Sequence, residues 1–216
     1  MSAMTLPLAL DFPDSDGQPM ADNTLQYEWI SLVKWNVEAY FRDDPNVFVA
    51  GDNLIYPDPT DATVRQAPDV YVAFGRPKGY RGSYKLWEEA DIFPQVIFEV
   101  WSPNNRADEM EAKRRFYEYW GAEEYYLIYP DHPMHADGWR RENDALVKID
   151  AMNGHVSPRL GMQFELKRGR LKLFGPDRRE MKNPEAIARD RDEAERRAKL
   201  LADKLRELGI DPDGVK

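Results

Sequence analysis

The sequence of 216 residues contains no cysteine and only three histidines. Without cysteine the chain has no disulfide bond, no thiolate zinc site and no cysteine nucleophile. The histidines, His132, His135 and His155, all lie in turn-rich sequence, so they offer little material for a Ser-His-Asp triad or a histidine-based metal site. Any metal ion would therefore be bound by carboxylates, which favours hard ions such as Mg²⁺ or Mn²⁺.

Long apolar runs and an excess of positive charge are also missing. No apolar stretch reaches the length of a membrane span, and the acidic N-terminus lacks the basic start of a signal peptide. We therefore expect a cytoplasmic protein that does not interact with a membrane, and we expect no organic cofactor. The net charge of −9 argues against a general nucleic-acid coat protein, although a compact acidic active site can coexist with a local basic strip.

The composition supports one sizeable domain with appended segments, because 42% of the residues are hydrophobic and 12% are aromatic. We predict a loosely ordered arm over residues 1–24, a domain over 25–183, and a helix and tail over 184–216. Periodic apolar residues predict helices over 25–41 and 107–120. Runs of β-branched and aromatic residues predict strands over 47–50, 53–56, 70–74, 93–101, 125–129, 145–149, 162–167 and 170–174. This order indicates an α/β fold (α+β mixed sheet), with helices flanking a mixed sheet and β-hairpins added after it.

The segment from residue 184 to 208 differs from the rest of the chain. Apolar residues recur there at alternating three- and four-residue steps, and charges of both signs cover the remaining positions. This pattern is typical of an amphipathic or coiled-coil helix that needs a partner. We therefore expect the protein to form a homodimer.

Two acidic residues lie on apolar strand segments. Asp69 stands at the start of the strand 70–74, and Glu99 lies inside the central strand. If these strands pair, the two carboxylates converge, and they must then share a proton or a cation such as Mg²⁺. Lys113, on the following helix, could reach the same point and stabilise charge on a phosphoryl group. The alternatives are that Asp69 caps a turn, that Glu99 pairs with an arginine, and that Lys113 forms a surface pair with Glu109.

A glycine-rich loop from Gly75 to Lys85 carries four cations, at Arg76, Lys78, Arg81 and Lys85. Its glycines allow close approach of a nucleic-acid backbone, so these cations are candidate phosphate contacts. The alternative is a solvated, flexible loop.

Three further residues are candidates for supporting the acidic pair. They are Ser102, Glu109 and Tyr117, which lie on or near the helix that follows Glu99. Tyr117, Tyr119 and Trp120 could also stack on bases, but aromatic residues at helical spacing are more often part of a core.

Three segments resemble the Uma two family of putative restriction endonucleases. They are residues 66–79 (QAPDVYVAFGRPKG), residues 98–106 (FEVWSPNNR) and residues 123–126 (EEYY). The resemblance extends with compatible spacing from about Trp35 to Phe174. That family belongs to the PD-(D/E)XK nuclease-like superfamily, so the resemblance implies a restriction-endonuclease-like core and a metal-dependent phosphodiesterase.

The resemblance also implies roles for particular residues. Asp69 matches the aspartate of the PD element, and Glu99 matches the second acidic metal ligand. The superfamily's usual lysine would stand two residues after Glu99, where this sequence has Trp101. In the Uma two pattern a lysine occurs instead on the following helix and matches Lys113. The acid that superfamily members often add from the first helix corresponds to Glu38.

Three hypotheses follow. The first is a Mg²⁺-dependent (or Mn²⁺-dependent) endonuclease that hydrolyses nucleic-acid phosphodiester bonds, with DNA the expected partner. The second is a catalytically inactive nuclease-fold module that binds nucleic acid or a protein. The third is an assembly module in which the C-terminal helix mediates oligomerisation, and it is compatible with either of the others.

Overall fold

The computed structural model describes residues 10–15, 17, 19–209 and 211–212. The chain divides into two compact units, Met1–Met181 and Lys182–Lys216. A six-stranded sheet in the order β1-β3-β5-β6-β7-β8 forms the centre of the first unit. Its strands are β1 (Val47–Ala50), β3 (Val70–Phe74), β5 (Val96–Val100), β6 (Glu124–Tyr129), β7 (His135–Glu142) and β8 (Ala145–Lys148).

The sheet is mixed, as the sequence predicts. Strand β5 runs parallel to β6, and every other neighbouring pair is antiparallel. The helix α2 (Ala107–Trp120) connects β5 to β6, which is the crossover that a parallel pair requires. As a result, the C-terminal ends of β5 and β6 lie at the same edge of the sheet, beside the start of β3.

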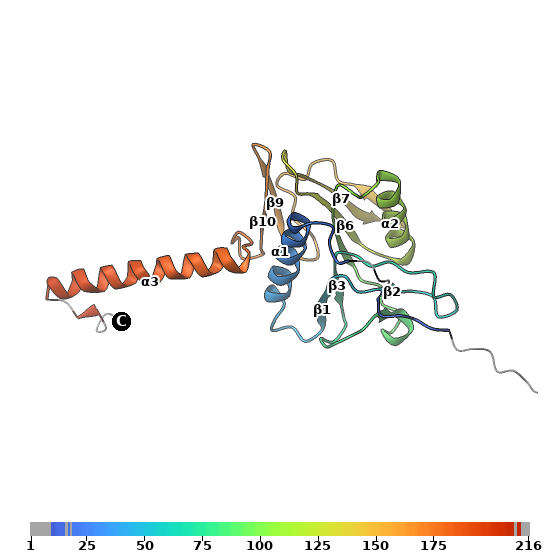
Figure 1. Ribbon diagram of the computed structural model, residues 1–216, viewed down its shortest axis with the longest axis horizontal. Coiled ribbons are helices and arrows are strands. Elements are labelled where there is room, and N and C mark those ends of the chain that lie inside the picture. Colours follow the sequence, from blue (N-terminus) through green and yellow to red (C-terminus); the bar gives the residue numbers. More distant parts are fainter. Residues whose placement is uncertain (1–9, 16, 18, 210, 213–216) are drawn as a thin grey trace, which may run out of the picture. The chain divides into compact units, whose positions relative to one another are not determined.

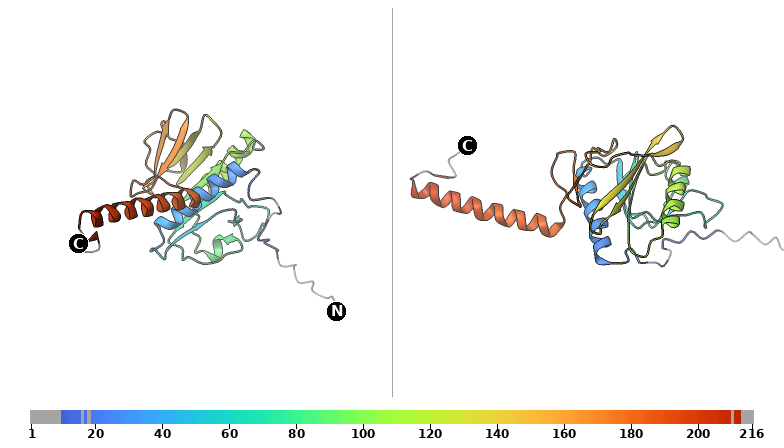
Figure 2. Two further views of the ribbon diagram at one scale, coloured as in Figure 1. Left: turned by 60° about the vertical axis from the view of Figure 1, so that its left-hand side comes forward. Right: turned by 90° about the horizontal axis from the view of Figure 1, so that it is seen from above.

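One helix covers each face of the sheet (Figures 1 and 2). Helix α1 (Thr24–Tyr40) begins at Asn23, whose side chain accepts a hydrogen bond from the Gln26 N–H at 2.9 Å. It packs on the face that carries Val70 and Phe98. Helix α2 packs on the opposite face and ends at Gly121, whose φ of 107° suits a glycine. Both helices lie where the apolar periodicity predicts them.

A β-hairpin adds to the face that α1 covers. Its strands are β9 (Gln163–Lys167) and β10 (Arg170–Phe174). Arg168 and Gly169 at its tip have φ values of 53° and 70°, which gives the tight turn that the sequence predicts. Beside the main sheet, β2 (Ile55–Tyr56) and β4 (Tyr84–Lys85) form a short parallel pair, followed by the 3₁₀ helix η1 (Leu86–Glu88).

The sequence-based predictions miss strand β7, because its charged and exposed residues and its central Gly138 hide the strand pattern between His135 and Glu142. In the described part of the N-terminal arm, Phe12 packs edge-on against Tyr56 and Trp87. Residues 1–9, 16 and 18 of that arm lie outside the described residues.

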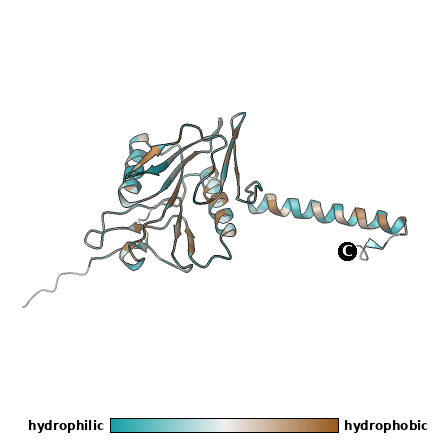
Figure 3. Cartoon of the chain, turned by 180° about the vertical axis from the view of Figure 1, so that it is seen from behind, coloured by the Kyte–Doolittle hydropathy of each residue, from teal (hydrophilic) through white to brown (hydrophobic). Residues whose placement is uncertain are grey.

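The second unit consists mainly of helix α3 (Pro184–Glu207). Asn183 caps its start by accepting a hydrogen bond from the Ala186 N–H at 2.8 Å. None of the helix residues is buried, and apolar segments alternate with polar ones along it (Figure 3). Within the described ranges, no helix combines the length and the apolar character that crossing a membrane requires.

Candidate active site

The antiparallel pairing of β3 and β5 brings Asp69 and Glu99 together. Val70 lies opposite Phe98, so the next pair in the register is Asp69 and Glu99. The backbone N–H of Val100 donates a hydrogen bond of 2.6 Å to Oδ2 of Asp69. Both carboxylates therefore lie at the sheet edge where β5 ends, as expected for a paired acidic site.

Each carboxylate oxygen of Glu99 accepts a hydrogen bond from α2. The Tyr117 hydroxyl donates to Oε1 at 2.6 Å, and Lys113 Nζ donates to Oε2 at 2.9 Å. The Glu99 side chain is only 2% exposed, whereas that of Lys113 is 27% exposed. Lys113 thus neutralises part of the charge on Glu99 while it remains in contact with solvent. The hydrogen-bond partners of Glu99 from α2 are therefore a lysine and a tyrosine, and not the arginine of the alternative interpretation.

Burial and the neighbouring charge perturb the acidic pair. Burial first, and then the charge of Glu99, raise the pKa of Asp69 well above its ordinary value, and the positive charge of Lys113 only partly offsets this. Burial and Glu99 also raise the pKa of Tyr117 well above the usual range. The Tyr117 hydroxyl therefore stays protonated and remains a hydrogen-bond donor to Glu99.

A third acid, Asp52, lies close enough to raise the pKa of Asp69 further. It follows β1 in a left-handed conformation, with φ of 53°, and its N–H donates to the carbonyl of Pro68 at 3.1 Å. The preceding Gly51 has no room for a side chain, because a Cβ there would lie 2.5 Å from the Asp69 carbonyl oxygen. The sequence signal for Asp52 was an acid directly after a strand that pairs with β3.

The arrangement suits a single divalent cation. Two facing carboxylates, one of which has a raised pKa because of its burial and of the other's charge, would be stabilised by a shared positive ion. Among the residues that the structure describes, no group of three or more acidic, histidine or cysteine side chains is placed so that it could hold a metal ion. The facing pair Asp69 and Glu99 would need further oxygen ligands, from water or a substrate, to hold a Mg²⁺ or Mn²⁺ ion.

Three predicted site residues do not contact this pair. Glu38 forms an ion pair of 2.7 Å with Lys34 on α1, on the other side of the sheet. Glu109 is exposed and lies 4.0 Å from Arg106. Ser102 is buried, but its hydroxyl donates to Asp22. Sequence position alone could not separate these three from Tyr117, which does contact Glu99.

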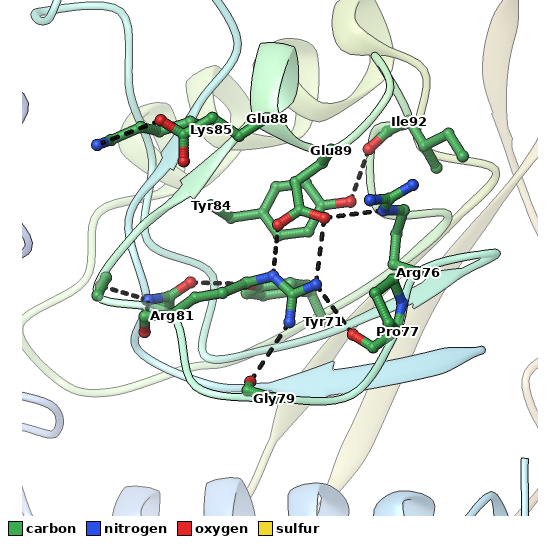
Figure 4. Close-up of polar contacts among 12 residues, drawn as sticks. Tyr71, Arg76, Pro77, Gly79, Arg81, Tyr84, Lys85, Glu88, Glu89 and Ile92 are labelled. Carbon is green, nitrogen blue, oxygen red and sulfur yellow. Dashed lines mark hydrogen bonds and ion pairs between the residues drawn. The ribbon is translucent and has the colours of Figure 1, made fainter. Parts of the chain in front are cut away.

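The basic loop is occupied by internal contacts (Figure 4). Arg76 Nε lies 2.8 Å from Oε2 of Glu89, and Arg81 donates to both oxygens of the same carboxylate. The guanidinium of Arg81 also lies 4.0 Å from the ring centre of Phe48. The two arginines therefore fasten the loop to the buried Glu89, and they are not available as the phosphate contacts that the sequence predicts.

The two lysines of this loop have partners too. Lys78 Nζ donates to the carbonyl oxygens of Phe41 and Arg42, at 2.5 and 2.8 Å, where α1 ends. Lys85 Nζ lies 3.8 Å from Glu88. All four cations of the loop therefore have partners within the protein.

A different cationic surface surrounds the β9–β10 hairpin. A cavity of about 460 Å³ there is lined by His132, Glu165, Lys167, Arg168, Arg170 and Lys172. The Met134 N–H donates to the Gly169 carbonyl at 2.9 Å, which fixes the hairpin tip beside the start of β7. Because His135 pairs with Tyr129, at the end of β6, this tip lies at the same edge of the sheet as Glu99.

Comparisons with known proteins identify a family and one similar solved structure. The family model described as "Uma2: Putative restriction endonuclease" matches residues 21–169. A similar solved structure is that of a putative nuclease belonging to DUF820 from Anabaena variabilis. Its sequence identity is 12%, its TM-score is 0.46, and the match covers 63% of this chain and 72% of that chain. No curated protein matches the chain.

Proposed function

The chain belongs to the Uma2 family of putative restriction endonucleases, and from this premise we propose that it is a metal-dependent endonuclease acting on DNA. Its catalytic residues in this proposal are Asp69, Glu99 and Lys113, with Tyr117 positioning Glu99. The supporting observation is that Asp69 faces Glu99 while Lys113 and Tyr117 hold the two oxygens of Glu99.

Each residue has a distinct task in this proposal. Asp69 and Glu99 would hold a Mg²⁺ or Mn²⁺ ion, which would polarise a phosphoryl oxygen and activate the attacking water. Tyr117 fixes the orientation of Glu99 through its 2.6 Å hydrogen bond. The ammonium of Lys113 lies beside the carboxylates and is partly exposed, so it can stabilise the negative charge that develops on the phosphoryl group. Lys113 thereby replaces the lysine that the superfamily motif has two residues after Glu99.

The substrate backbone is proposed to contact the hairpin cations. Lys167, Arg168 and Arg170 lie around the hairpin tip, at the same sheet edge as the acidic pair. Clustered cations of this kind bind phosphates and release counterions. A local basic surface also explains how a chain with a net charge of −9 could bind a polyanion.

Cleavage of supercoiled plasmid tests the proposal. The purified protein is incubated with Mg²⁺, with Mn²⁺ and with EDTA, together with the variants Asp69→Asn, Glu99→Gln and Lys113→Met. We expect nicking that requires the metal ion and is lost in all three variants. Glu109→Gln is the matched control, since it removes an acid from the same helix that does not contact the pair, and it should cleave as the wild type does.

The same experiment can contradict the proposal. If neither metal ion supports cleavage while the protein still binds the plasmid, the chain is a catalytically inactive nuclease-fold module. Cleavage that persists in Asp69→Asn would show that the acidic pair is not the active site.

A further inference from the structure

A cavity of about 220 Å³ lies beside the acidic pair, between α2 and the strands β5, β6 and β7. Four of its ten lining residues are aromatic, and these are Trp101, Tyr125, Tyr129 and Trp139. The proposed hydrolysis of phosphodiester bonds uses none of these residues. The volume is below the 300–1,000 Å³ that is usual for a drug-sized ligand, so it suits a single small ring system.

The cavity lies next to the acidic site, because residues of β5 with its extension and of α2 contribute to both. Glu99 and Trp101 are two residues apart on β5 and its extension, so their side chains lie on one face, roughly 7 Å apart along the strand. The Trp101 N–H donates to the Ile128 carbonyl at 2.7 Å, which keeps this residue in the sheet. On α2, Met110 of the cavity precedes Lys113 of the acidic site by about one turn. A group in the cavity would therefore be a neighbour of a group at Asp69 and Glu99.

The hydroxyl group of Tyr125 has no partner. Tyr125 lines the cavity, is only 1% exposed, and its oxygen is the single buried side-chain polar atom without a hydrogen bond among the described residues. Buried polar groups are nearly always paired, because leaving one unpaired destabilises the fold. The hydroxyl is thus an unsatisfied donor and acceptor on a residue that lines the cavity. Burial and the nearby charge of Glu99 raise the pKa of Tyr125, so it stays protonated.

The walls of the cavity are held in place by their own contacts. Arg114 donates to both carboxylate oxygens of Glu111 at 2.9 Å, and to Glu118 at 3.0 Å. Its guanidinium lies 5.9 Å from the ring centre of Trp139. The rings of Trp101 and Tyr129 stack with their centres 5.4 Å apart. A ligand would therefore enter a largely formed site with apolar walls and charged groups around it.

We propose that this cavity receives one nucleobase of the nucleic-acid strand whose phosphodiester group lies at Asp69 and Glu99. A base fits the site because it has two flat faces for aromatic walls and an edge of donors and acceptors for Tyr125. The linkage of a base to its phosphate through one sugar matches the short separation between the cavity and the acidic pair. This inference deepens the proposed nuclease function and rests on it for the identity of the strand.

Binding in EDTA, where the proposed cleavage cannot occur, tests the inference. The intact protein is titrated with the four deoxynucleosides and with deoxyribose 5-phosphate, which has no base, using ligand-observed NMR. A labelled single-stranded 12-mer is then titrated by fluorescence anisotropy, with and without one abasic residue at each position in turn. We expect binding of at least one nucleoside, no binding of the sugar phosphate, and weaker binding of the 12-mer when the abasic residue takes the cavity position. The expected loss is about 5- to 150-fold, which corresponds to about 1–3 kcal/mol for one stacked base.

Two variants test whether the nucleoside binds in this cavity. Ala107→Phe places a ring at an exposed cavity-lining position without touching the acidic pair, and it should abolish nucleoside binding. Tyr125→Phe removes only the unpaired hydroxyl, and it should weaken nucleoside binding by about 2- to 10-fold. Trp35→Phe, at an exposed position on α1 that does not line the cavity, is the control and should bind as the wild type does.

The outcomes separate this inference from the nuclease proposal. Nucleoside binding that Ala107→Phe abolishes would support the inference even if the plasmid is never cleaved. If the plasmid is cleaved but no nucleoside binds, or if Ala107→Phe binds the 12-mer normally, the inference is overturned and the nuclease proposal remains. Binding of free indole without binding of any nucleoside would also overturn it, because the cavity would then take an aromatic side chain of a protein.

Discussion

Two buried tyrosines, Tyr117 on α2 and Tyr125 on β6, differ in what their hydroxyl groups do. Tyr117 donates to the buried carboxylate of Glu99, and Tyr125 has no partner. Tyr117→Phe should therefore lower the free energy of unfolding by about 1.5–3 kcal/mol, the contribution of a hydrogen bond to a charged group. Tyr125→Phe, its matched control, should leave stability nearly unchanged. Urea unfolding of both variants checks this, and equal losses of stability would contradict the assigned contacts.

The raised pKa of Asp69 makes the stability of the metal-free protein depend on pH. Because folding raises this pKa, the free energy of unfolding falls as pH rises from the ordinary range of an aspartate through the raised value. Asp69→Asn keeps an oxygen acceptor for the Val100 N–H and removes the charge. In EDTA at neutral pH the variant should be more stable than the wild type, by about 1.4 kcal/mol for each unit of pKa shift.

Urea unfolding between pH 4 and 8 measures this difference. The advantage of Asp69→Asn should shrink towards pH 4, where Asp69 carries its proton in the folded protein. A variant that is less stable than the wild type at every pH would contradict the assigned cause of the shift.

The positions of single residues could be predicted from the sequence where strand pairing determines them. Asp69 and Glu99 meet because two adjacent apolar strands pair in the register that also buries their apolar residues. The sequence predicts Arg76 and Arg81 as phosphate contacts because it cannot reveal that Glu89, further along the chain, is buried between them. The helical spacing predicts a core position for Tyr119, but Tyr119 is exposed, because the helical period does not tell which side of a wide aromatic stripe is covered.

At the scale of elements, the contacts of Glu89 fasten the loop between β3 and β4. Burial alone would raise the pKa of Glu89, but the hydrogen bonds from Arg81 and Arg76 outweigh it and lower the pKa. Glu89→Gln leaves two partly buried arginines without a counter-charge and should lower the free energy of unfolding by about 3–5 kcal/mol at neutral pH. The matched control is Glu88→Gln, which removes an exposed neighbouring acid.

The pH dependence of this variant distinguishes charge from packing. A lowered pKa gives stability that is present above the ordinary pKa of a glutamate and is lost as pH falls through the lowered value. The difference between Glu89→Gln and the wild type should therefore shrink below about pH 4. Equal effects of Glu88→Gln and Glu89→Gln would contradict the assigned role.

The β9–β10 hairpin carries the proposed backbone contacts. Charge reversal at Lys167 and Arg170 should weaken binding of duplex DNA, and the slope of log K against log salt should decrease by about 1 for each lost phosphate contact. Electrophoretic mobility shifts in EDTA at several salt concentrations measure this. Lys199→Glu on α3 makes the same charge change in the other unit, and a comparable loss of binding in that control would contradict a specific hairpin surface.

Most elements could be predicted because their apolar periodicity is strong. The bounds of α2 and β3 agree with the prediction to the residue, since a proline or glycine signal lies near their ends. Strand β7 could not be predicted, because its alternate residues are exposed and charged, and Gly138 leaves space that Met152 fills. Strand β7 is held by its pairing with β6 and β8, and its own sequence lacks the apolar alternation that would predict a strand.

At the scale of the whole molecule, the chain forms two units with different requirements. Unit Met1–Met181 contains the buried core, whereas α3 in the second unit has no buried residue despite its apolar positions. We propose that α3 pairs with α3 of a second copy. Removal of the residues after Asn183 should convert a dimer into a monomer while the midpoint of urea unfolding of the first unit, measured at low protein concentration, stays unchanged.

Multi-angle light scattering measures the oligomeric state. Leu201→Glu in the full chain changes a single exposed apolar position of α3 and should weaken the dimer, whereas Lys199→Glu should not. If the truncated chain keeps the mass of the full assembly, α3 does not mediate oligomerisation.

The hydrogen bond from the Val100 N–H to Asp69 makes one backbone amide a spectroscopic reporter of the site. This amide donates to an ionisable side chain rather than to a neighbouring strand, at 2.6 Å. Its proton chemical shift is therefore sensitive to the charge on Asp69. A single resonance of a ¹⁵N-labelled sample would follow protonation of this carboxylate and its occupation by a cation, without substrate, turnover or any mutation.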